Sequence, residues 1–434
     1  MVLSGDMKMR ILLVNPPIYD FTAYDFWLRP YGLLEAAGAL RGKAEFVLFD
    51  YLDRYSKLIA DRSRLKSDRW GRGRFTEQRI EAPAPLANIR RYFRRYGVGR
   101  ELFQELLSNS EPFDFALVQT AMTYWYPGVA EVIEDIRQNQ PQARIILGGN
   151  YATICTEHAK GLDADLVICG TELEPLWDYI GIEPDASEPA LWEAYGELKT
   201  GALKLSDGCP FNCTYCSVPR VYGGFAARPI EKALAELELM LKLGAENIAF
   251  YDDALLYKAD DALVSFLQEV IGRGIKVNFH TPNALNARFL TSELARLMVR
   301  AGFKTFYLGF ESASIRWQRQ TGSKVFSEEL AAAVEHLKQA GAKADDITAY
   351  QILGHPRMDI QELEESMRFV SSLGIRGMLA DFSPIPGTPD GDACSQWVDM
   401  NEPLMHNKTA FTIIRVGFDE ANRLKDLQRT LNRR

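Results

Sequence analysis

Residues 204–220 read KLSDGCPFNCTYCSVPR and hold three of the chain's six cysteines, Cys209, Cys213 and Cys216, at the spacing C-x3-C-x2-C. Each of the four irons in a [4Fe–4S] cluster takes a thiolate, so three cysteines leave one iron open to a small chelating ligand. A zinc site requires a fourth ligand, and no Cys or His follows the segment at finger-like spacing. The segment therefore predicts a cluster with an open iron. The alternatives for a fourth ligand are distant in the sequence: Cys155, Cys169 and Cys394.

Six apolar segments, separated by amphipathic helical segments, run through the second half of the chain, and the cysteines follow the first of them. Helical spacing is clear at 229–244 and 291–302. Consecutive βα units predict a partial (β/α)6 barrel over residues 201–390, with its chemistry at the carboxyl ends of the strands. Residues 391–434 are expected to form a mostly polar C-terminal segment with one helical tail. The expected strands cover residues 202–208, 247–255, 276–285, 304–313, 347–356 and 377–389.

A second alternating series precedes the barrel. Helical spacing occurs at 31–41 and 127–138, between apolar runs that read as buried strands. This pattern predicts an α/β fold with a doubly wound, Rossmann-like parallel sheet in residues 1–185, joined to the barrel by a linker at 186–200. Ligands of such sheets bind beyond the carboxyl ends of the strands. The expected strands cover residues 10–17, 45–53, 113–122, 143–152 and 164–172.

The charge of the chain is uneven. The net charge is -8, yet residues 54–100 carry 14 Lys/Arg against 4 Asp/Glu. This basic insertion indicates an anionic ligand or substrate, and its stretch IRRYFRRYGVGR holds Arg90, Arg91, Arg94 and Arg95. The alternative is a solvated, partly helical insertion whose arginine stems cover apolar surface. A small-molecule or lipid substrate is expected, and nucleic acid is not.

The sequence contains no apolar run of about 20 residues, so no membrane span is expected. The start, MVLSGDMKMRILLVNPP, reads as a strand rather than a signal peptide. Clustered cysteines in a long chain are typical of metal or redox sites in a reducing compartment, which predicts a cytoplasmic protein.

The cysteine motif and its place after the first of six βα units resemble the radical S-adenosylmethionine (SAM) superfamily. The resemblance implies that the open iron chelates the amino and carboxylate groups of SAM. It implies that an external reductase of the flavodoxin or ferredoxin type supplies an electron. Cleavage of the sulfonium then gives methionine and a 5′-deoxyadenosyl radical, which removes a hydrogen atom from the substrate. No side chain of the chain itself is assigned a catalytic role.

The resemblance extends to the ends of the later strands and implies contacts to SAM there. Without the resemblance, paired aspartates after a strand are typical helix caps, and a lone glutamate is typical of a surface salt bridge. We interpret His280 and His355 as hydrogen-bonded structural histidines, with a place in the same cavity as the alternative. The implied SAM-binding residues are Tyr215, Asp252, Asp253, Glu311, Ser312 and Ile385.

Residues 9–175 resemble the cobalamin-binding domain that precedes the barrel in a subset of radical SAM enzymes. Glycines that end a strand let the backbone approach a ligand closely. The cobalt-ligating motif Asp-x-His-x-x-Gly is absent, and we interpret TEHAKG at 156–161 as a chance likeness, so no protein imidazole is expected on cobalt. A tight turn, or a domain without cofactor, is the alternative. The implied cobalamin-binding residues are Pro16, Thr120, Met122, Thr123, Tyr124, Gly148, Gly149, Asn150, Thr153, Gly170 and Glu172.

Together the resemblances imply an enzyme that uses a [4Fe–4S] cluster, SAM and cobalamin to methylate an unactivated carbon or phosphorus centre. One alternative is a rearrangement, cyclisation or oxidation, with or without cobalamin, and another is a non-catalytic sensor that binds the iron–sulfur cluster or cobalamin. Methylthiotransferases of the superfamily carry a second three-cysteine cluster in their N-terminal domain. That reading is disfavoured because the N-terminal domain here has only Cys155 and Cys169.

Overall fold

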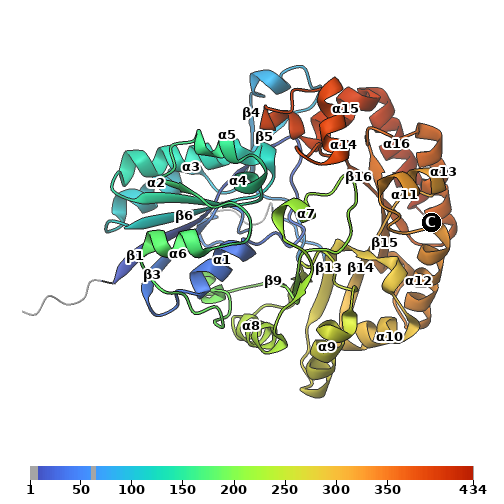
Figure 1. The fold of residues 1–434 in the computed structure, drawn as a ribbon, viewed down its shortest axis with the longest axis horizontal. Coiled ribbons are helices and arrows are strands. Elements are labelled where there is room, and N and C mark those ends of the chain that lie inside the picture. The colour runs from blue at the N-terminus through green and yellow to red at the C-terminus, as the bar shows by residue number, and fades with distance from the viewer. Residues whose placement is uncertain (1–7, 60–64, 434) are drawn as a thin grey trace, which may run out of the picture. The chain divides into compact units, whose positions relative to one another are not determined.

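The computed structural model of the chain describes residues 8–59 and 65–433, which form two compact units (Figure 1). The first unit comprises the described residues up to Ala87, Arg91–Lys199 and Ala235–Ala245. The second unit comprises Asn88–Arg90, Thr200–Leu234 and the described residues from Glu246 onward. Each unit is built on a parallel sheet of its own.

A five-stranded parallel sheet forms the centre of the first unit, in the order β3-β1-β6-β7-β8. The succession of strands changes direction between β1 and β6. In doubly wound sheets, ligands bind beyond the carboxyl ends of the strands at such a reversal. The strands are β1 (Met9–Asn15), β3 (Ala44–Asp50), β6 (Phe115–Thr120), β7 (Arg144–Gly149) and β8 (Leu166–Val167).

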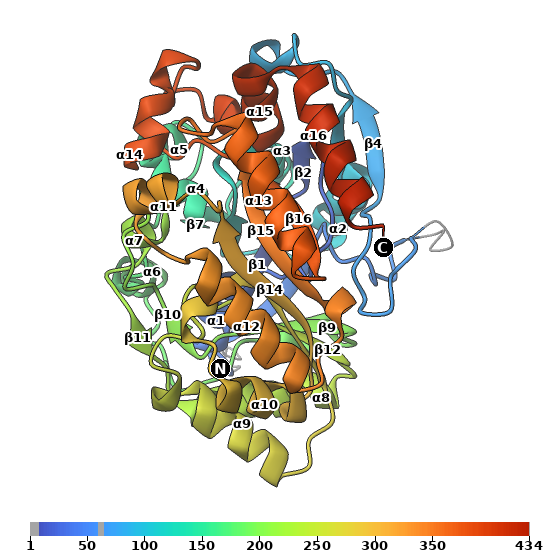
Figure 2. The ribbon, with the colours of Figure 1, turned by 90° about the vertical axis from the view of Figure 1, so that its right-hand side faces the viewer.

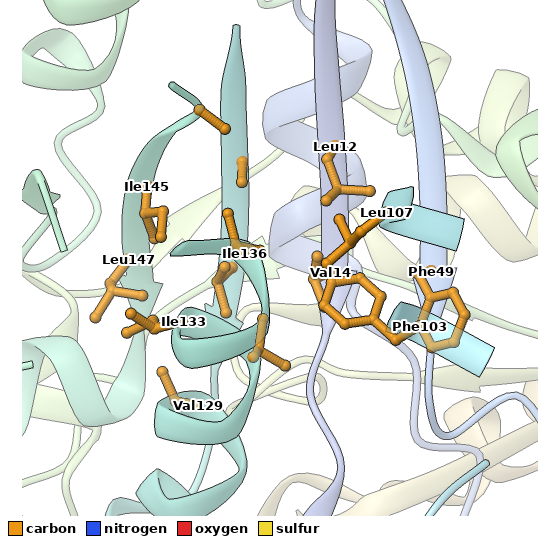
Figure 3. Packing of buried hydrophobic residues seen from close by; sticks show 14 of the residues in the cluster. Leu12, Val14, Phe49, Phe103, Leu107, Val129, Ile133, Ile136, Ile145 and Leu147 are labelled. Carbon is orange, nitrogen blue, oxygen red and sulfur yellow. The ribbon is translucent and has the colours of Figure 1, made fainter. Parts of the chain in front are cut away.

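Helices cover both faces of this sheet, because alternate residues of each strand point to opposite sides. Leu12 and Val14 of β1 pack with α2 and α3 on one face (Figure 3). Ile11 and Leu13 pack with α1 and α6 on the other face. The doubly wound sheet predicted from the sequence is therefore confirmed. The covering helices are α1 (Tyr31–Gly38), α2 (Arg100–Asn109), α3 (Tyr126–Asn139) and α6 (Glu174–Ile180).

Strand β8 is much shorter than the expected strand at 164–172. The ladder ends where the N–H of Ile168 donates to the carbonyl of Leu147. Beyond it, the N–H of Gly170 donates to the hydroxyl of Thr153 and not to a neighbouring strand. Two short helices, α4 (Asn150–Ile154) and α5 (Thr156–Lys160), lie between β7 and β8.

The basic insertion forms strands, contrary to the alternative of a partly helical insertion. A three-stranded antiparallel sheet, ordered β2-β5-β4, joins it to the segment after β1. Its one regular helical element among the described residues is a 3-10 turn at Ala84–Leu86. The part at 60–64 lies outside the described residues. The strands are β2 (Ile18–Asp20), β4 (Glu77–Ile80) and β5 (Phe93–Tyr96).

Several arginines of the insertion pair with acidic groups of the first unit. Arg95 is buried and lies 2.6 Å from Glu131, and Arg94 lies 3.4 Å from Glu77. A buried guanidinium requires such a partner because its desolvation is costly. Arg95 is thus engaged in the fold, contrary to the expectation that it binds an external anion.

The second unit contains a six-stranded parallel sheet whose strands follow one another in chain order, from β9 to β16. Its two outer strands do not pair with each other, so the barrel is partial, as predicted. The strands are β9 (Thr200–Leu203), β12 (Asn247–Phe250), β13 (Asn278–Asn286), β14 (Phe303–Glu311), β15 (Ile347–Leu353) and β16 (Arg376–Asp381).

Helices connect these strands, and Figure 2 shows α12, α13 and α16 in front of β14, β15 and β16. The antiparallel pair β10 (Ser206–Asp207) and β11 (Ala226–Ala227) flanks the cysteine loop. The helices are α7 (Val218–Val221), α8 (Ile230–Lys242), α9 (Leu263–Gly272), α10 (Ser292–Ala301), α11 (Ile315–Thr321), α12 (Ser327–Gln339) and α13 (Ile360–Ser372).

Up to Arg433, the C-terminal segment contains all or part of three α-helices, where a single helical tail was expected. These are α14 (Pro389–Asp392), α15 (Lys408–Val416) and α16 (Phe418–Leu431). Leu424 of α16 packs with Leu353 and Leu363, so the segment completes the core over β15 and α13. Within the described part of the chain, no helix is both long enough and apolar enough to cross a membrane.

Gly149 should be irreplaceable in the first unit, whereas Gly148 should not. Gly149 has φ +113, and a Cβ there would lie 2.1 Å from the carbonyl oxygen of Thr120. A Cβ at Gly148 would lie 3.9 Å from the nearest heavy atom, which is the Cβ of Ile168. We expect Gly149→Ala to lower the free energy of unfolding by about 2 kcal/mol or more, and Gly148→Ala to change it by less than about 1 kcal/mol. Urea unfolding of both variants measures the difference, and equal stabilities would contradict it.

Candidate functional site

The cysteine loop begins at the carboxyl end of β9, and Asp252 holds its first residues. The Asp252 carboxylate accepts hydrogen bonds from the N–H of Leu205 (3.0 Å) and the hydroxyl of Ser206 (2.6 Å). Burial raises the pKa of Asp252 to about 6, against these hydrogen bonds. Asp252, expected as a SAM ligand, is therefore engaged in shaping the loop that follows β9.

The three thiols of the loop are each partly buried. Hydrogen bonding to the backbone of Phe211 and of Val218 lowers the pKa values of Cys209 and Cys216, and the hydroxyl of Tyr215 does the same for Cys213. Burial raises the pKa of all three thiols, that of Cys216 to about 11. The thiolate is the form that ligates a metal, and a nearby positive charge favours it.

Lys324 supplies this charge, and the sequence analysis did not find it. Its ammonium lies 2.9 Å from Oε1 of Glu311, and its charge lowers the pKa values of Cys209, Cys213 and Cys216 against the effect of burial. Burial disfavours the ammonium, but Glu311 and the thiol of Cys213 outweigh burial and raise the pKa of Lys324.

Glycine makes room for this cation. A Cβ at Gly309 would lie 2.6 Å from the Lys324 ammonium. The only sequence signal for Lys324 is its place 13 residues after Glu311, beyond a turn in which Ser323 has a positive φ. From the sequence alone, such a separation does not show whether the two side chains lie close together in the folded barrel.

Two carboxylate oxygens at this edge of the sheet are open for a ligand. Oε2 of Glu311 is buried and has no hydrogen-bond partner among the described residues, and Glu311 has the uncommon φ of 63°. Asp253 is partly buried, and no hydrogen bond joins it to the part of the chain that the structure describes. A buried acceptor without a partner costs free energy, so it indicates a group that binds there.

The other residues expected to contact SAM are partly engaged in the fold. The ring of Tyr215 stacks on Trp317 with centroids 5.9 Å apart. The hydroxyl of Ser312 accepts from the N–H of Ser314 at the start of α11. The carbonyl of Ile385 accepts from the N–H and hydroxyl of Thr388, while its side chain is partly exposed. Their contacts to SAM stay predictions.

Both histidines considered above are fully buried and hydrogen-bonded. The ring of His280 contacts Thr305 (2.9 Å) and Asn247 (3.0 Å) through its two nitrogens. His355 lies 3.1 Å from Asp390. Their structural interpretation agrees with these contacts.

Cys394 is not placed as a ligand. Its side chain is fully buried in a cluster with Phe382, Val398 and Phe411, and its thiol donates to the carbonyl of Asp390. Burial raises its pKa to about 12. Cys155 and Cys169 belong to the first unit.

The donor set fits a cluster with an open iron. Among residues 8–59 and 65–433, no three His, Cys, Asp or Glu side chains converge closely enough to hold a single metal ion. A [4Fe–4S] cluster instead takes its thiolates on separate irons, as a loop with three spaced cysteines allows. The open carboxylates of Asp253 and Glu311 suit a ligand that carries amino and hydroxyl groups.

The second ligand edge lies at the carboxyl ends of β6 and β7 in the first unit. The hydroxyl of Thr120 accepts from the N–H of Ala152 at 3.0 Å. The hydroxyl of Thr153 donates to the carbonyl of Gly149 and accepts from the N–H of Gly170, both at 2.9 Å. These hydroxyls hold the loops in place and leave the backbone at Gly148 open.

The residues expected to bind cobalamin fall into three groups according to how exposed they are to solvent. The exposed group is Met122, Gly149, Asn150 and Glu172, and the partly exposed group is Gly148, Thr153 and Gly170. Pro16, Thr120, Thr123 and Tyr124 are buried. The buried four shape the edge more than they present side chains to a ligand.

His158 of TEHAKG is held by aromatic residues of the first unit. Its Nδ1 lies 2.5 Å from the hydroxyl of Tyr151, and its ring packs on Tyr126 at 4.6 Å. This arrangement agrees with the interpretation of the motif as a chance likeness.

Comparison with known protein families identifies the second unit. Residues 203–370, which include the cysteine loop and Glu311, match the Radical SAM superfamily. The chain contains a radical SAM domain. Such a domain implies a [4Fe–4S] cluster and SAM, for which the three cysteines, Lys324 and the open carboxylate oxygens provide suitable groups.

Curated relatives resemble part of the chain. An uncharacterized methyltransferase, PH0819, of Pyrococcus horikoshii is 27% identical over 191 residues, which are 43% of this chain and 40% of the relative. The ribosomal protein uS12 methylthiotransferase RimO of Trichlorobacter lovleyi is 32% identical over 145 residues, or 32% of this chain and 30% of the relative. The chain thus spans less than half the length of these relatives.

Solved structures resemble nearly all of the chain in fold. The radical SAM methyltransferase TsrM of Kitasatospora setae, with cobalamin and a [4Fe–4S] cluster bound, has a TM-score of 0.62 at 13% identity, covering 93% of this chain and 85% of TsrM. The cobalamin-dependent radical SAM enzyme OxsB has a TM-score of 0.59 at 13% identity, covering 98% of this chain and 61% of OxsB. The two-part fold predicted from the sequence is therefore confirmed.

The ion pair between Lys324 and Glu311 should stabilise the radical SAM domain. We expect Lys324→Met to lower the free energy of unfolding by about 3 kcal/mol, because the Glu311 carboxylate is left buried without its partner. Adding Glu311→Gln should recover most of the loss. Lys276→Met, at an exposed position, is the control and should change stability by less than about 0.5 kcal/mol. Chemical unfolding measures all four proteins, and a double variant as unstable as Lys324→Met would rule out this coupling.

Proposed function

We propose that the chain is a cobalamin-dependent radical SAM enzyme that methylates an unactivated carbon or phosphorus centre. The observation that carries the proposal is the pairing, in one chain, of a three-cysteine loop beside the partly buried Lys324 with a doubly wound sheet whose ligand edge is open at Gly148. The likeness of fold to TsrM and OxsB, which bind cobalamin, supports it.

The residues of the radical SAM domain bind and orient the cofactors. Cys209, Cys213 and Cys216 ligate three irons of the cluster. Asp253 receives the amino group of SAM, and Oε2 of Glu311 accepts a hydroxyl hydrogen of its ribose. SAM at the open iron supplies a 5′-deoxyadenosyl radical, and cobalamin supplies the methyl group. Because these cofactors carry the chemistry, the chain contributes position, charge and exclusion of water.

The first unit holds cobalamin at the carboxyl edge of its sheet. The backbone at Gly148 lies open to a large ring, Gly149 beside it is exposed, and Met122 is 41% exposed on the neighbouring loop after β6. His158 is engaged with Tyr151. We therefore expect cobalt to carry no protein imidazole.

The proposed enzyme requires an external reductase of the flavodoxin or ferredoxin type and a small-molecule or lipid substrate. The cysteines need a reducing compartment to remain thiolates, which favours the cytoplasm. The exposed basic groups of the insertion favour a substrate with an anionic group. Arg79 and Arg90 are exposed there, and the guanidinium of Arg79 lies 3.7 Å from the ring of Tyr92.

A methylthiotransferase is the second candidate, because curated relatives such as RimO carry that name. Those enzymes hold a second cluster, and the first unit here contains only Cys155 and Cys169. Iron content separates the two candidates, since one cluster contributes four irons and two clusters contribute eight.

Anaerobic purification with cobalamin supplied, followed by counting of iron, sulfide and cobalt per chain, tests the proposed function. We expect about four irons and about one cobalt. Changing all three cysteines of the loop to Ala should remove the iron and abolish formation of deoxyadenosine from SAM, and cobalt should stay bound. Four irons without cobalt would contradict the cobalamin mechanism, and about eight irons would favour the methylthiotransferase.

Gly148 provides a steric test of the cobalamin site. Gly148→Phe fills the open space at the end of β7, so we expect bound cobalt to fall by roughly tenfold while iron stays unchanged. The control is Ser108→Phe on α2, an exposed position, which should retain the cobalt of the parent protein. Unchanged cobalt in Gly148→Phe would place the corrin ring elsewhere.

A further inference from the structure

Thr214, between the second and third cysteines, is hydrogen-bonded at all of its polar groups. Its N–H donates to the carbonyl of Thr321 at 3.3 Å, and its carbonyl accepts from the N–H of Asp390 at 3.1 Å. Its hydroxyl donates to Oδ2 of Asp390. Two of these three bonds go to one residue on α14, which is 176 positions away in the sequence.

Asp390 is in turn held by its own partners. Nε2 of His355 lies 3.1 Å from Oδ2, and Nε of Arg357 lies 2.9 Å from Oδ1. Nδ1 of His355 accepts from the N–H of Arg357 at 3.1 Å and from the indole N–H of Trp317 at 3.4 Å. The imidazole proton is therefore on Nε2 and is donated to Asp390. Both Asp390 and His355 are fully buried.

The protonation of this pair follows from its surroundings. Burial lowers the pKa of His355, so the imidazole is neutral. Burial opposes the charge of Asp390, but the hydrogen bonds from His355 and Thr214 outweigh it and lower the pKa of the carboxyl. Asp390 is thus an anion whose Oδ2 faces Thr214 and His355 and whose Oδ1 faces Arg357, and an amide would keep only one of these two positions as an acceptor.

Aromatic contacts join the same network to the next residue of the loop. Trp317 stacks on Tyr215 and packs edge-on against His355, with centroids 5.1 Å apart. Side chains that follow β14, β15 and β16 therefore converge on the two residues between Cys213 and Cys216.

We propose that Asp390, supported by His355, is a positioning residue for the iron–sulfur cluster, because it holds Thr214 and thereby fixes the spacing of Cys213 and Cys216. The inference rests on the proposed function, because it requires that these cysteines ligate a cluster. Groups that hold metal ligands in place commonly change metal retention by 10- to 100-fold when they are removed. The loop has no regular secondary structure between Cys209 and Cys216, so its conformation depends on contacts of this kind.

The test compares Thr214→Val, which removes only the hydroxyl, with Thr214→Ser, which keeps it. We expect Thr214→Val to lose iron to a chelator about tenfold faster than the parent protein, and Thr214→Ser to stay within about twofold. Asp390→Asn should act in the same direction as Thr214→Val. The protein is reconstituted anaerobically, iron loss is followed by absorbance, and the EPR spectrum of the reduced cluster is recorded with and without SAM. We expect the SAM-induced spectral change to weaken in Thr214→Val.

Thr281→Val controls for the loss of a buried hydroxyl, because the bonds of Thr281 lie between β13 and β14. It should retain iron as the parent protein does, and thermal unfolding should show that each variant is folded. The inference is overturned if Thr214→Val retains iron as well as the parent, if Thr214→Ser fails to restore it, or if Thr281→Val loses iron equally fast. A parent protein that binds no cluster would instead contradict the proposed function.

Discussion

Parallel strand pairing is the constraint on which both units depend. In a parallel sheet every strand ends at the same edge, so residues far apart in the sequence meet where the strands stop. In the radical SAM domain this edge gathers the cysteine loop after β9, Asp253 after β12 and Glu311 at the end of β14. In the first unit the same constraint places Thr120 of β6 beside Gly149 of β7.

Burial and charge oppose each other at the cysteine loop. Burial alone favours neutral thiols, which would not ligate iron. Lys324 opposes this effect, and it remains charged because Glu311 pairs with it. The pair leaves one carboxylate oxygen of Glu311 without a partner, on a residue with the strained φ of 63°. Strain and an unsatisfied acceptor on one buried residue are typical of binding sites, where a ligand offsets their cost.

Much of the fold was predictable because it depends on local spacing. Apolar runs interrupted by amphipathic helices predicted both sheets, and the order of the six barrel strands follows from chain order. The strand predicted at 164–172 is longer than the observed β8, because the N–H of Gly170 donates to the side chain of Thr153 and not to a neighbouring strand. The strands of the basic insertion were not predicted, and the alternative of a partly helical insertion was wrong, because its arginine-rich composition gives no period-2 pattern of apolar residues. Its buried residues Phe93 and Tyr96 instead lie in a short antiparallel sheet.

The candidate site was predictable at the level of residue types but not of partners. The motif at 204–220 and the acidic residues after the strands are patterns of residues that are adjacent in the sequence, so they can be recognised without a structure. Asp252 and Asp253 are adjacent, yet only the folded structure shows that Asp252 is engaged with Leu205 and Ser206. No local pattern in the sequence indicates that Lys324 belongs to the site.

The sequence by itself therefore determined the α/β class, the two parallel sheets and the three cysteines with their spacing, since periodicity and spacing act over a few residues. Only the tertiary structure decided which polar side chains are already bonded within the fold and which remain available to a ligand. It paired Lys324 with Glu311, and it joined Thr214 to Asp390 across 176 residues. Hydrogen bonds and ion pairs over such distances exist only after the strands have paired, because pairing is what brings their ends to one edge.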